Sequence, residues 1–168
     1  MRRASATLAL ALGATMLGGA CAAERAPTGS APAAGWVETA KAANGAADDA
    51  MAEGDHERAR GALEEALRAP EPGGVAEEDR RIVRQDLLFH IAQVELSAGE
   101  PEAALRRAEE GLALGRHDDL FTANLLVVLG RAHEALGREE QAADDYYDAL
   151  EINDALLRRT LRPNEEIP

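Results

Sequence analysis

The sequence predicts an all-α domain built from three stacked helix pairs, and three observations support this. Hydrophobic residues make up 46% of the chain but aromatic residues only 3%, so the core must consist of alanine and leucine, which suits closely packed helices. Three stretches align without gaps around Gly54, Gly99 and Gly137, at spacings typical of stacked helical repeats. Apolar residues recur with helical periodicity on both sides of each glycine.

Each copy contains a first helix, a glycine turn and a second helix. We expect the glycine to end the first helix in the left-handed conformation that glycine adopts at little cost. Asp55 follows the first glycine and suits the start of a helix, and Pro101 suits the first turn of the second helix in copy two. The apolar positions of copy two illustrate the period: Leu87, Leu88, Ile91, Ala92 and Leu96 before the turn, then Ala104, Leu105, Ala108 and Leu112.

Four positions in each copy carry a size pattern that spans roughly residues 40 to 153. They are a small residue seven places before the glycine, an alanine early in the second helix, a larger residue four places later and a small residue three places after that. In order, they are Ala47, Ala92 and Gly130; Ala59, Ala104 and Ala142; Leu63, Ala108 and Tyr146; Ala66, Gly111 and Ala149. This pattern resembles the tetratricopeptide repeat. The sequence departs from the family by having Ala43, Leu88 and Leu126 where an aromatic residue is usual, and only Pro70 as a helix-ending proline.

The resemblance implies three tetratricopeptide helix-turn-helix pairs that form a short right-handed solenoid with a C-terminal helical extension or cap. We expect the domain at 36–162, with repeats at about 40–70, 85–115 and 123–153, an extension at 154–162 and a tail at 163–168. Residues 69–79 and 115–119 are the predicted connections between copies. The first helix of copy one has Met51 as the only large apolar residue in the stretch 39–54, so we expect this end to be the most mobile.

The N-terminus has the layout of a secretory signal peptide over residues 1–20, with Arg2 and Arg3 before an uncharged segment. Gly19, Ala20 and Cys21 resemble the lipobox of bacterial lipoproteins, although Gly18 stands where that motif has an aliphatic residue. Three interpretations stay open: lipid attachment at Cys21, cleavage to a soluble protein, or an uncleaved membrane anchor. All three export the domain. The small-residue composition of 21–35 predicts a flexible tether.

The charge and motif content exclude several functions. A formal net charge of −13 argues against binding to nucleic acid or to anionic lipid headgroups, since both need a basic face. The four histidines have no metal-binding spacing, and Asp118 and Asp119 better suit a helix start than a cation site. No phosphate loop or nucleophile motif is present. We therefore predict no catalytic residue, no metal and no cofactor.

The resemblance implies that the first helices of the repeats line a concave partner-binding groove. Counted in register, the groove residues are Lys41, Asn44, Asp48, Met51, Asp86, Phe89, Gln93, Leu96, Asn124, Val127, Arg131 and Glu134. Phe89, Leu96 and Val127 either form an apolar contact patch or pack locally. With only two cations beside several acids, the groove does not resemble the clamp by which some family members bind terminal carboxylates. Tyr147 is expected outside the groove, as a contact or a simple surface residue.

We expect an exported, lipid-anchored adaptor or scaffold that binds a protein or peptide partner in a bacterial envelope complex. The expected location is the outer membrane, facing the periplasm, with a soluble periplasmic protein as the alternative. The membrane is contacted only through an N-terminal lipid. The alternative functions are a structural module that self-associates through its groove and an enzyme with an unrecognised site.

Overall fold

The computed structural model describes residues 31–161, and all regular structure in this range is helical. The helices are α1 Ala31–Ala52, α2 His56–Arg68, α3 Glu77–Ser97, α4 Pro101–Ala113, α5 Leu120–Ala135 and α6 Glu139–Leu161. The predicted all-α class is therefore confirmed. The predicted signal peptide, Cys21 and most of the predicted tether, together with the tail at 163–168, lie outside the described residues. No helix within 31–161 is both long and apolar enough to span a membrane.

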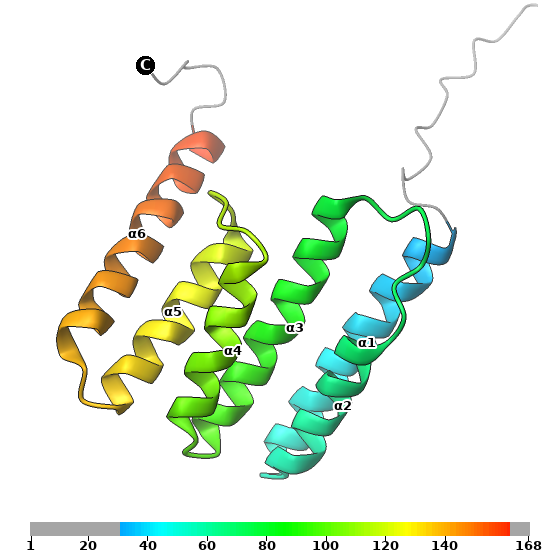
Figure 1. Ribbon diagram of the computed structural model, residues 1–168, viewed down its shortest axis with the longest axis horizontal. Coiled ribbons are helices and arrows are strands. Elements are labelled where there is room, and N and C mark those ends of the chain that lie inside the picture. Colours follow the sequence, from blue (N-terminus) through cyan, green and yellow to red (C-terminus); the bar gives the residue numbers. More distant parts are fainter. Residues whose placement is uncertain (1–30, 162–168) are drawn as a thin grey trace, which may run out of the picture.

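The helices form antiparallel pairs that stand in a row (Figure 1). Each helix packs against the next helix along the chain, and α3 also packs against both α1 and α5. The odd-numbered helices thus form one layer and the even-numbered helices flank it. Turns within pairs lie at one edge of the row, and connections between pairs lie at the other. This is a helical-repeat-like architecture.

The three repeat glycines end α1, α3 and α5 as predicted. Gly54, Gly99 and Gly137 have φ angles of 77°, 78° and 71°, which lie in the left-handed region. At each turn the amide after the glycine donates to a carbonyl five residues back, as from Asp55 to Ala50 at 2.9 Å. The glycine amide itself donates to a carbonyl three residues back. This paired bonding satisfies carbonyls that the end of a helix would otherwise leave open.

The predicted helix starts are also confirmed. The side chain of Asp55 accepts a hydrogen bond from the amide of Arg58 at 3.0 Å and so caps α2. Pro101 is the first residue of α4. Asp119 caps α5 by accepting from the amide of Thr122 at 2.9 Å. The acidic pair at 118–119 therefore contains a helix start, which is the role the sequence favoured.

The small residues of the repeat pattern allow close helix contacts. All the alanines and glycines of the four patterned positions are buried, as is Leu63. A Cβ atom on Gly130 would lie 2.6 Å from the ring of Tyr146, so the absent side chain makes room for that ring between α5 and α6. A Cβ on Gly111 would lie 2.7 Å from Leu125, which is the equivalent contact between α4 and α5. The size pattern is thus a packing pattern.

Helix α1 differs from the sequence prediction at its start. It begins at Ala31, so residues 31–35, which were assigned to the tether, belong to the helix. Trp36 is buried at 7% exposure in one apolar cluster with Val83 and Leu87 of α3 and with Val75 of the connection between α2 and α3. The alanine-rich composition concealed this anchor, because small residues surround Trp36 in the sequence. The first helix of copy one therefore has a large buried side chain besides the partly buried Met51.

The connections agree with prediction in position, although the first is shorter. Helix α3 begins at Glu77, so the connection between α2 and α3 ends before the acidic residues 77–79, which stabilise the first turn of the helix. Residues 114–119 connect α4 to α5. Residues 154–161 continue α6 without a break and are an extension of the last helix. A separate cap, the other predicted possibility, is not formed by these residues.

A buried polar cluster joins α3 to the connection between α4 and α5. Arg81 is only 6% exposed and forms ion pairs with Glu78 at 2.5 Å and with Asp119 at 2.6 Å. It also donates to the side chain of Gln85, which is fully buried. The amide of Gln85 donates to the carbonyls of Gly111 at 3.0 Å and Gly115 at 2.8 Å. The cluster thus fixes the end of α4 and the start of α5 against α3.

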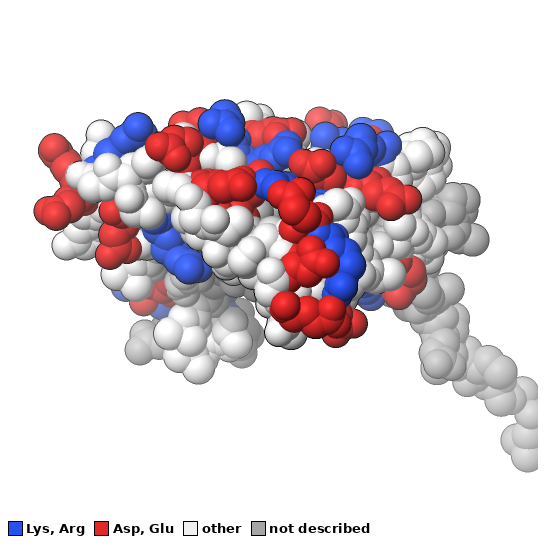
Figure 2. All heavy atoms as spheres, turned by 90° about the horizontal axis from the view of Figure 1, so that it is seen from below, with Lys and Arg blue, Asp and Glu red and all other residues white. Residues whose placement is uncertain are grey.

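Ion pairs link the flanking helices α2 and α4, which do not otherwise pack together. Arg107 of α4 contacts Glu64 of α2 at 2.7 Å, and Arg60 of α2 contacts Glu100 at 2.6 Å. Arg107 also lies 3.5 Å from the buried Glu95, whose pKa is raised by burial despite this neighbour. Figure 2 views the edge of the row where the turns within pairs lie, and it shows acidic and basic side chains interspersed across that edge. Most surface arginines therefore have acidic neighbours, which is unsuited to binding a polyanion.

We predict that Gly130→Ala destabilises the fold and Gly61→Ala stabilises it. A Cβ on Gly130 would force the Tyr146 ring to move, and such overpacking costs about 1 to 3 kcal/mol. This exceeds the gain of about 1 kcal/mol that alanine offers over glycine within a helix. Gly61 is exposed on α2 with open space at its Cβ position, so only the gain applies. Thermal unfolding followed by circular dichroism tests both, and equal stabilisation would contradict the proposed packing.

We predict that Asp119→Asn lowers stability in a pH-dependent way. Burial alone would raise the pKa of Asp119, but the Thr122 amide and Arg81 outweigh it, so the pKa lies below its ordinary value in an unfolded chain. The carboxylate therefore stabilises the fold fully above that ordinary pKa and stops doing so as the pH falls through its lower, folded pKa. Asparagine keeps the cap but loses the ion pair with Arg81, at a cost on the order of 1 to 2 kcal/mol. Unfolding measured from pH 7 to pH 3 should show the difference shrinking, and a constant difference would contradict it.

Candidate partner-binding face

The outward side of the α1, α3 and α5 layer, here called the odd-helix face, is the surface on which the twelve groove residues were predicted to lie. None of the twelve is fully buried. Lys41, Asp48, Val127, Arg131 and Glu134 are exposed, and the other seven are half-buried. The register derived from the turn glycines therefore places these side chains on accessible surface, because residues three or four apart share one side of a helix.

A pocket of about 230 Å³ lies on the odd-helix face where the three helix pairs meet. Four predicted residues line it: Asp48, Met51, Gln93 and Arg131. The remaining lining residues are Ala47, Leu63, His90, Val94 and Ser97. The pocket thus combines an acid, a base, an amide, an imidazole and a hydroxyl above a small apolar floor. Because α1, α3 and α5 each contribute, a bound chain segment would contact all three repeat copies at once.

Polar contacts between α1 and α3 fix the residues beside the pocket. The amide nitrogen of Asn44 donates to Asp86 Oδ2 at 2.8 Å, and His90 Nε2 lies 3.8 Å from Asp86 Oδ1. The ring of Phe89 meets that of His90 edge to face, with centroids 5.1 Å apart. The side-chain oxygen of Asn44 is buried without a hydrogen-bond partner in the described chain. These contacts orient His90, which lines the pocket. They also occupy Asn44 and Asp86 with a hydrogen bond between the two side chains.

The apolar residues of the predicted groove do not form a patch together. Phe89 and Leu96 are half-buried and pack against the cluster formed by α3, α4 and α5, so for these two the local-packing alternative is the one observed. Val127 is 36% exposed. A single exposed valine is ordinary on a protein surface. The odd-helix face therefore offers a polar contact surface, and its hydrophobic side chains serve mainly the core beneath it.

The charged residues of this face differ in availability. Lys41 is paired with Glu38 of the same helix at 2.9 Å. Glu134 accepts a hydrogen bond from the hydroxyl of Tyr146 at 2.9 Å, and burial together with this bond raises the pKa of Tyr146 to about 12. Asp48 and Arg131 line the pocket and carry opposite charges. They are therefore the two charged residues best placed to select a partner.

Sequence reasoning missed the two polar residues His90 and Ser97, which line the pocket together with three apolar residues that were not predicted to do so. Each of the two polar residues directly follows a predicted groove residue in the sequence. Each therefore lies at the border of the helix side that carries the predicted groove residues. The equivalent positions in the other copies hold Gly45 and Val128 for His90, and Ala52 and Ala135 for Ser97. A polar residue that interrupts small or apolar residues at a repeat position was the available signal.

His133 and Asp145 form another polar pair, which joins α5 to α6. His133 Nδ1 lies 2.7 Å from Asp145 Oδ2, and both side chains are about 15% exposed. Burial raises the pKa of Asp145 even though His133 favours its charged form. In the described part of the chain, no cluster of three or more histidine, cysteine, aspartate or glutamate residues could hold a metal ion. The pair is therefore explained by packing between the two helices.

Comparison of the chain with protein-family models, with curated proteins and with solved structures finds no match. The function must therefore be argued from the side chains themselves. The best candidate for a binding site on the odd-helix face is the pocket, because it brings accessible, chemically varied groups from three helices together at one place. Its size and openness suit a few side chains of a bound polypeptide.

Proposed function

We propose that this protein is an exported adaptor of the tetratricopeptide type that binds an extended segment of a protein partner across the odd-helix face. The repeated glycine turns, the buried small residues and the packing of odd helices against one another support the repeat assignment. The observation that carries the binding function is the pocket lined from α1, α3 and α5. Repeat arrays of this kind bind along such shared surfaces because each unit contributes similar positions.

The chemistry of the pocket defines the partner segment. Gln93, His90 and Ser97 can hydrogen-bond to the backbone or to polar side chains of an extended peptide. Arg131 and Asp48 select a segment with opposite charges spaced to meet them. The small apolar floor has room for an aliphatic side chain of modest size. The expected ligand is thus a mixed polar segment, distinct from the acidic terminal carboxylate that a cation clamp would bind.

Export and lipid attachment complete the proposal, and they rest on the sequence of residues 1–21. With a lipid on Cys21, the adaptor would act at the surface of a bacterial envelope membrane, with the outer membrane facing the periplasm as the proposed site. Helix α1 begins at Ala31, so the segment between the lipid and the domain is shorter than composition alone suggested. A short lead keeps the binding face near the membrane and raises the local concentration of membrane-bound partners.

We predict that Arg131→Glu abolishes partner capture while leaving the fold intact. Reversing this charge places a carboxylate at an exposed position of the pocket, where it repels the acidic group of the partner that Arg131 attracts. The full-length protein would be used as bait with detergent-solubilised membranes from its own cells, and captured proteins identified by mass spectrometry. The matched control is Arg106→Glu, the same change at an exposed position of α4, in the other helix layer. Equal capture by both variants would rule out the odd-helix face as the binding site.

We predict that Cys21→Ser moves the protein from the membrane fraction to the soluble fraction of the envelope. Serine cannot form the thioether that attaches the lipid, while the signal segment before it is unchanged. Fractionation with immunodetection checks this, and metabolic labelling with a fatty acid should show lipid on the wild-type chain alone. A Cys21→Ser chain that stays with the membrane would refute the lipid anchor and leave export untouched.

A further inference from the structure

Helix α6 carries large hydrophobic side chains that the rest of the described chain leaves exposed. Tyr147, Leu150, Leu157 and Leu161 are between 56% and 72% exposed. Together with Asp154, they are spaced alternately by three and four residues, which is the spacing of a seam between two paired helices. These five residues are called the α6 stripe. Isolated exposed hydrophobic side chains are common, but four on one helix stripe are not.

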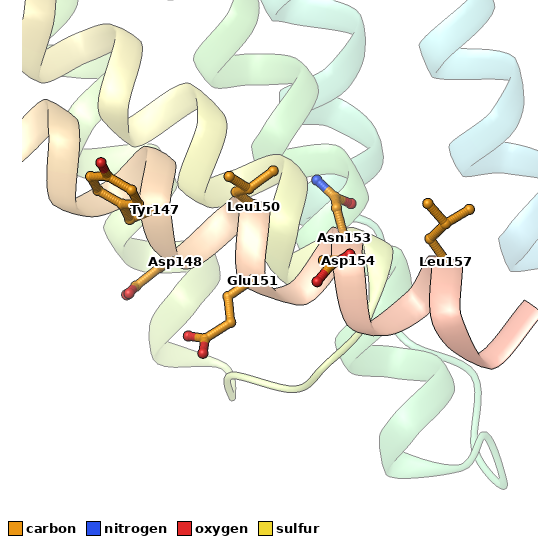
Figure 3. A pocket seen from close by; sticks show the side chains of 7 residues that line it. All are labelled: Tyr147, Asp148, Leu150, Glu151, Asn153, Asp154 and Leu157. Atoms are coloured by element: carbon orange, nitrogen blue, oxygen red, sulfur yellow. The ribbon is translucent and has the colours of Figure 1, made fainter. Parts of the chain in front are cut away.

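The α6 stripe borders an open hollow of about 690 Å³. Figure 3 shows Tyr147, Leu150 and Leu157 projecting from the same side of the helix, while Asp148 and Glu151 project from another side. A different side of α6, which contains the buried Ala142 and Ala149, packs against α5, and no other described helix packs against α6. At 23 residues α6 is also longer than α5, with 16, so its last turns extend beyond that partner. The stripe is therefore an unpartnered end of the helix row (Figure 1).

The charges beside the stripe have opposite signs at its two ends. Glu151 directly follows Leu150, and Arg158 directly follows Leu157, so both lie on the same flank of the stripe, two helical turns apart. The first half of α6 is acidic and its last turn is basic, with Arg158 and Arg159. In an antiparallel pair of identical helices, equal flanks meet, so each Glu151 faces the Arg158 of the other copy. In a parallel pair the two different flanks would meet instead, so Glu151 and Arg158 would have no charged partner across the seam.

We propose that the α6 stripe pairs with the α6 stripe of a second copy of this chain, in an antiparallel, two-fold symmetric dimer. Leucine and tyrosine side chains form the seam, and two symmetry-related Glu151–Arg158 pairs fix its direction. Asp154 contacts Arg158 of its own helix at 2.5 Å and supplies one polar position in the seam, a device that selects a single register. This inference does not depend on partner binding by the odd-helix face.

The first experiment measures the mass of the full-length protein in detergent micelles by size-exclusion chromatography with light scattering, over a range of concentrations. We expect a monomer–dimer equilibrium. Leu150→Glu with Leu157→Glu should raise the dimer dissociation constant at least about a hundredfold, because two seam side chains become charged. Val127→Glu is the matched control, an exposed apolar residue on the odd-helix face, and should leave the dimer unchanged. Circular dichroism checks that each variant is folded.

The second experiment tests direction and register by charge reversal, which leaves the apolar seam intact. Glu151→Arg alone and Arg158→Glu alone should each weaken dimerisation about tenfold, since each creates two repulsive contacts. The double variant restores opposite charges with their places exchanged and should recover wild-type dimerisation. Recovery supports the antiparallel pairing, because a general change in charge would not be reversed by the second substitution.

Three results would overturn the proposal. The first is a wild-type chain that stays monomeric at hundreds of micromolar, which would leave the stripe to another protein or to another segment of this chain. The second is a dimer that dissociates with Val127→Glu but persists with the changes at Leu150 and Leu157, which would place self-association on the odd-helix face. The third is a charge-reversed double variant that dimerises no better than the single variants.

Discussion

The buried guanidinium of Arg81 is the constraint on which the arrangement of the second and third helix pairs depends. A charge removed from water is tolerated only when it is paired and hydrogen-bonded, and Arg81 has Glu78, Asp119 and Gln85 around it. Gln85 extends the cluster to two carbonyls at the end of α4. A shift of α4 or α5 along α3 would leave these buried groups without partners, so the cluster selects one register. That register also sets where Gln93 and Arg131 meet in the pocket.

The parts of the fold that sequence could predict are governed by local rules. A glycine at a left-handed turn, an aspartate at a helix start and a small residue at a close contact each depend on a few neighbouring positions. Gly130 against Tyr146 is such a case, because the repeat register alone pairs a small position with a large one. The same register placed the groove residues on accessible surface. Local periodicity therefore accounts for the helices, the turns and the orientation of the odd-helix face.

The parts that sequence could not predict depend on contacts between distant residues. Arg81 and Asp119 are 38 residues apart, and nothing near either one shows that they meet. Trp36 stands in a stretch whose small residues are typical of a tether, and its burial is decided by Val83 and Leu87 of another helix. Phe89 has the register of a groove residue, yet its ring packs against the core of the neighbouring helices. His90 likewise lines the pocket only because three helices come together around it.

The packing order of the helices has a consequence for how the chain acquires its structure. Among the described helices, each packs only with neighbours one or two places away along the chain, as α3 does with α1, α2, α4 and α5. Such topologies have low contact order and fold rapidly, because few long loops must close before contacts form. Assembly can begin at any pair and spread to the next. A chain that emerges gradually, one end first, could therefore consolidate each pair as it appears without waiting for its distant end.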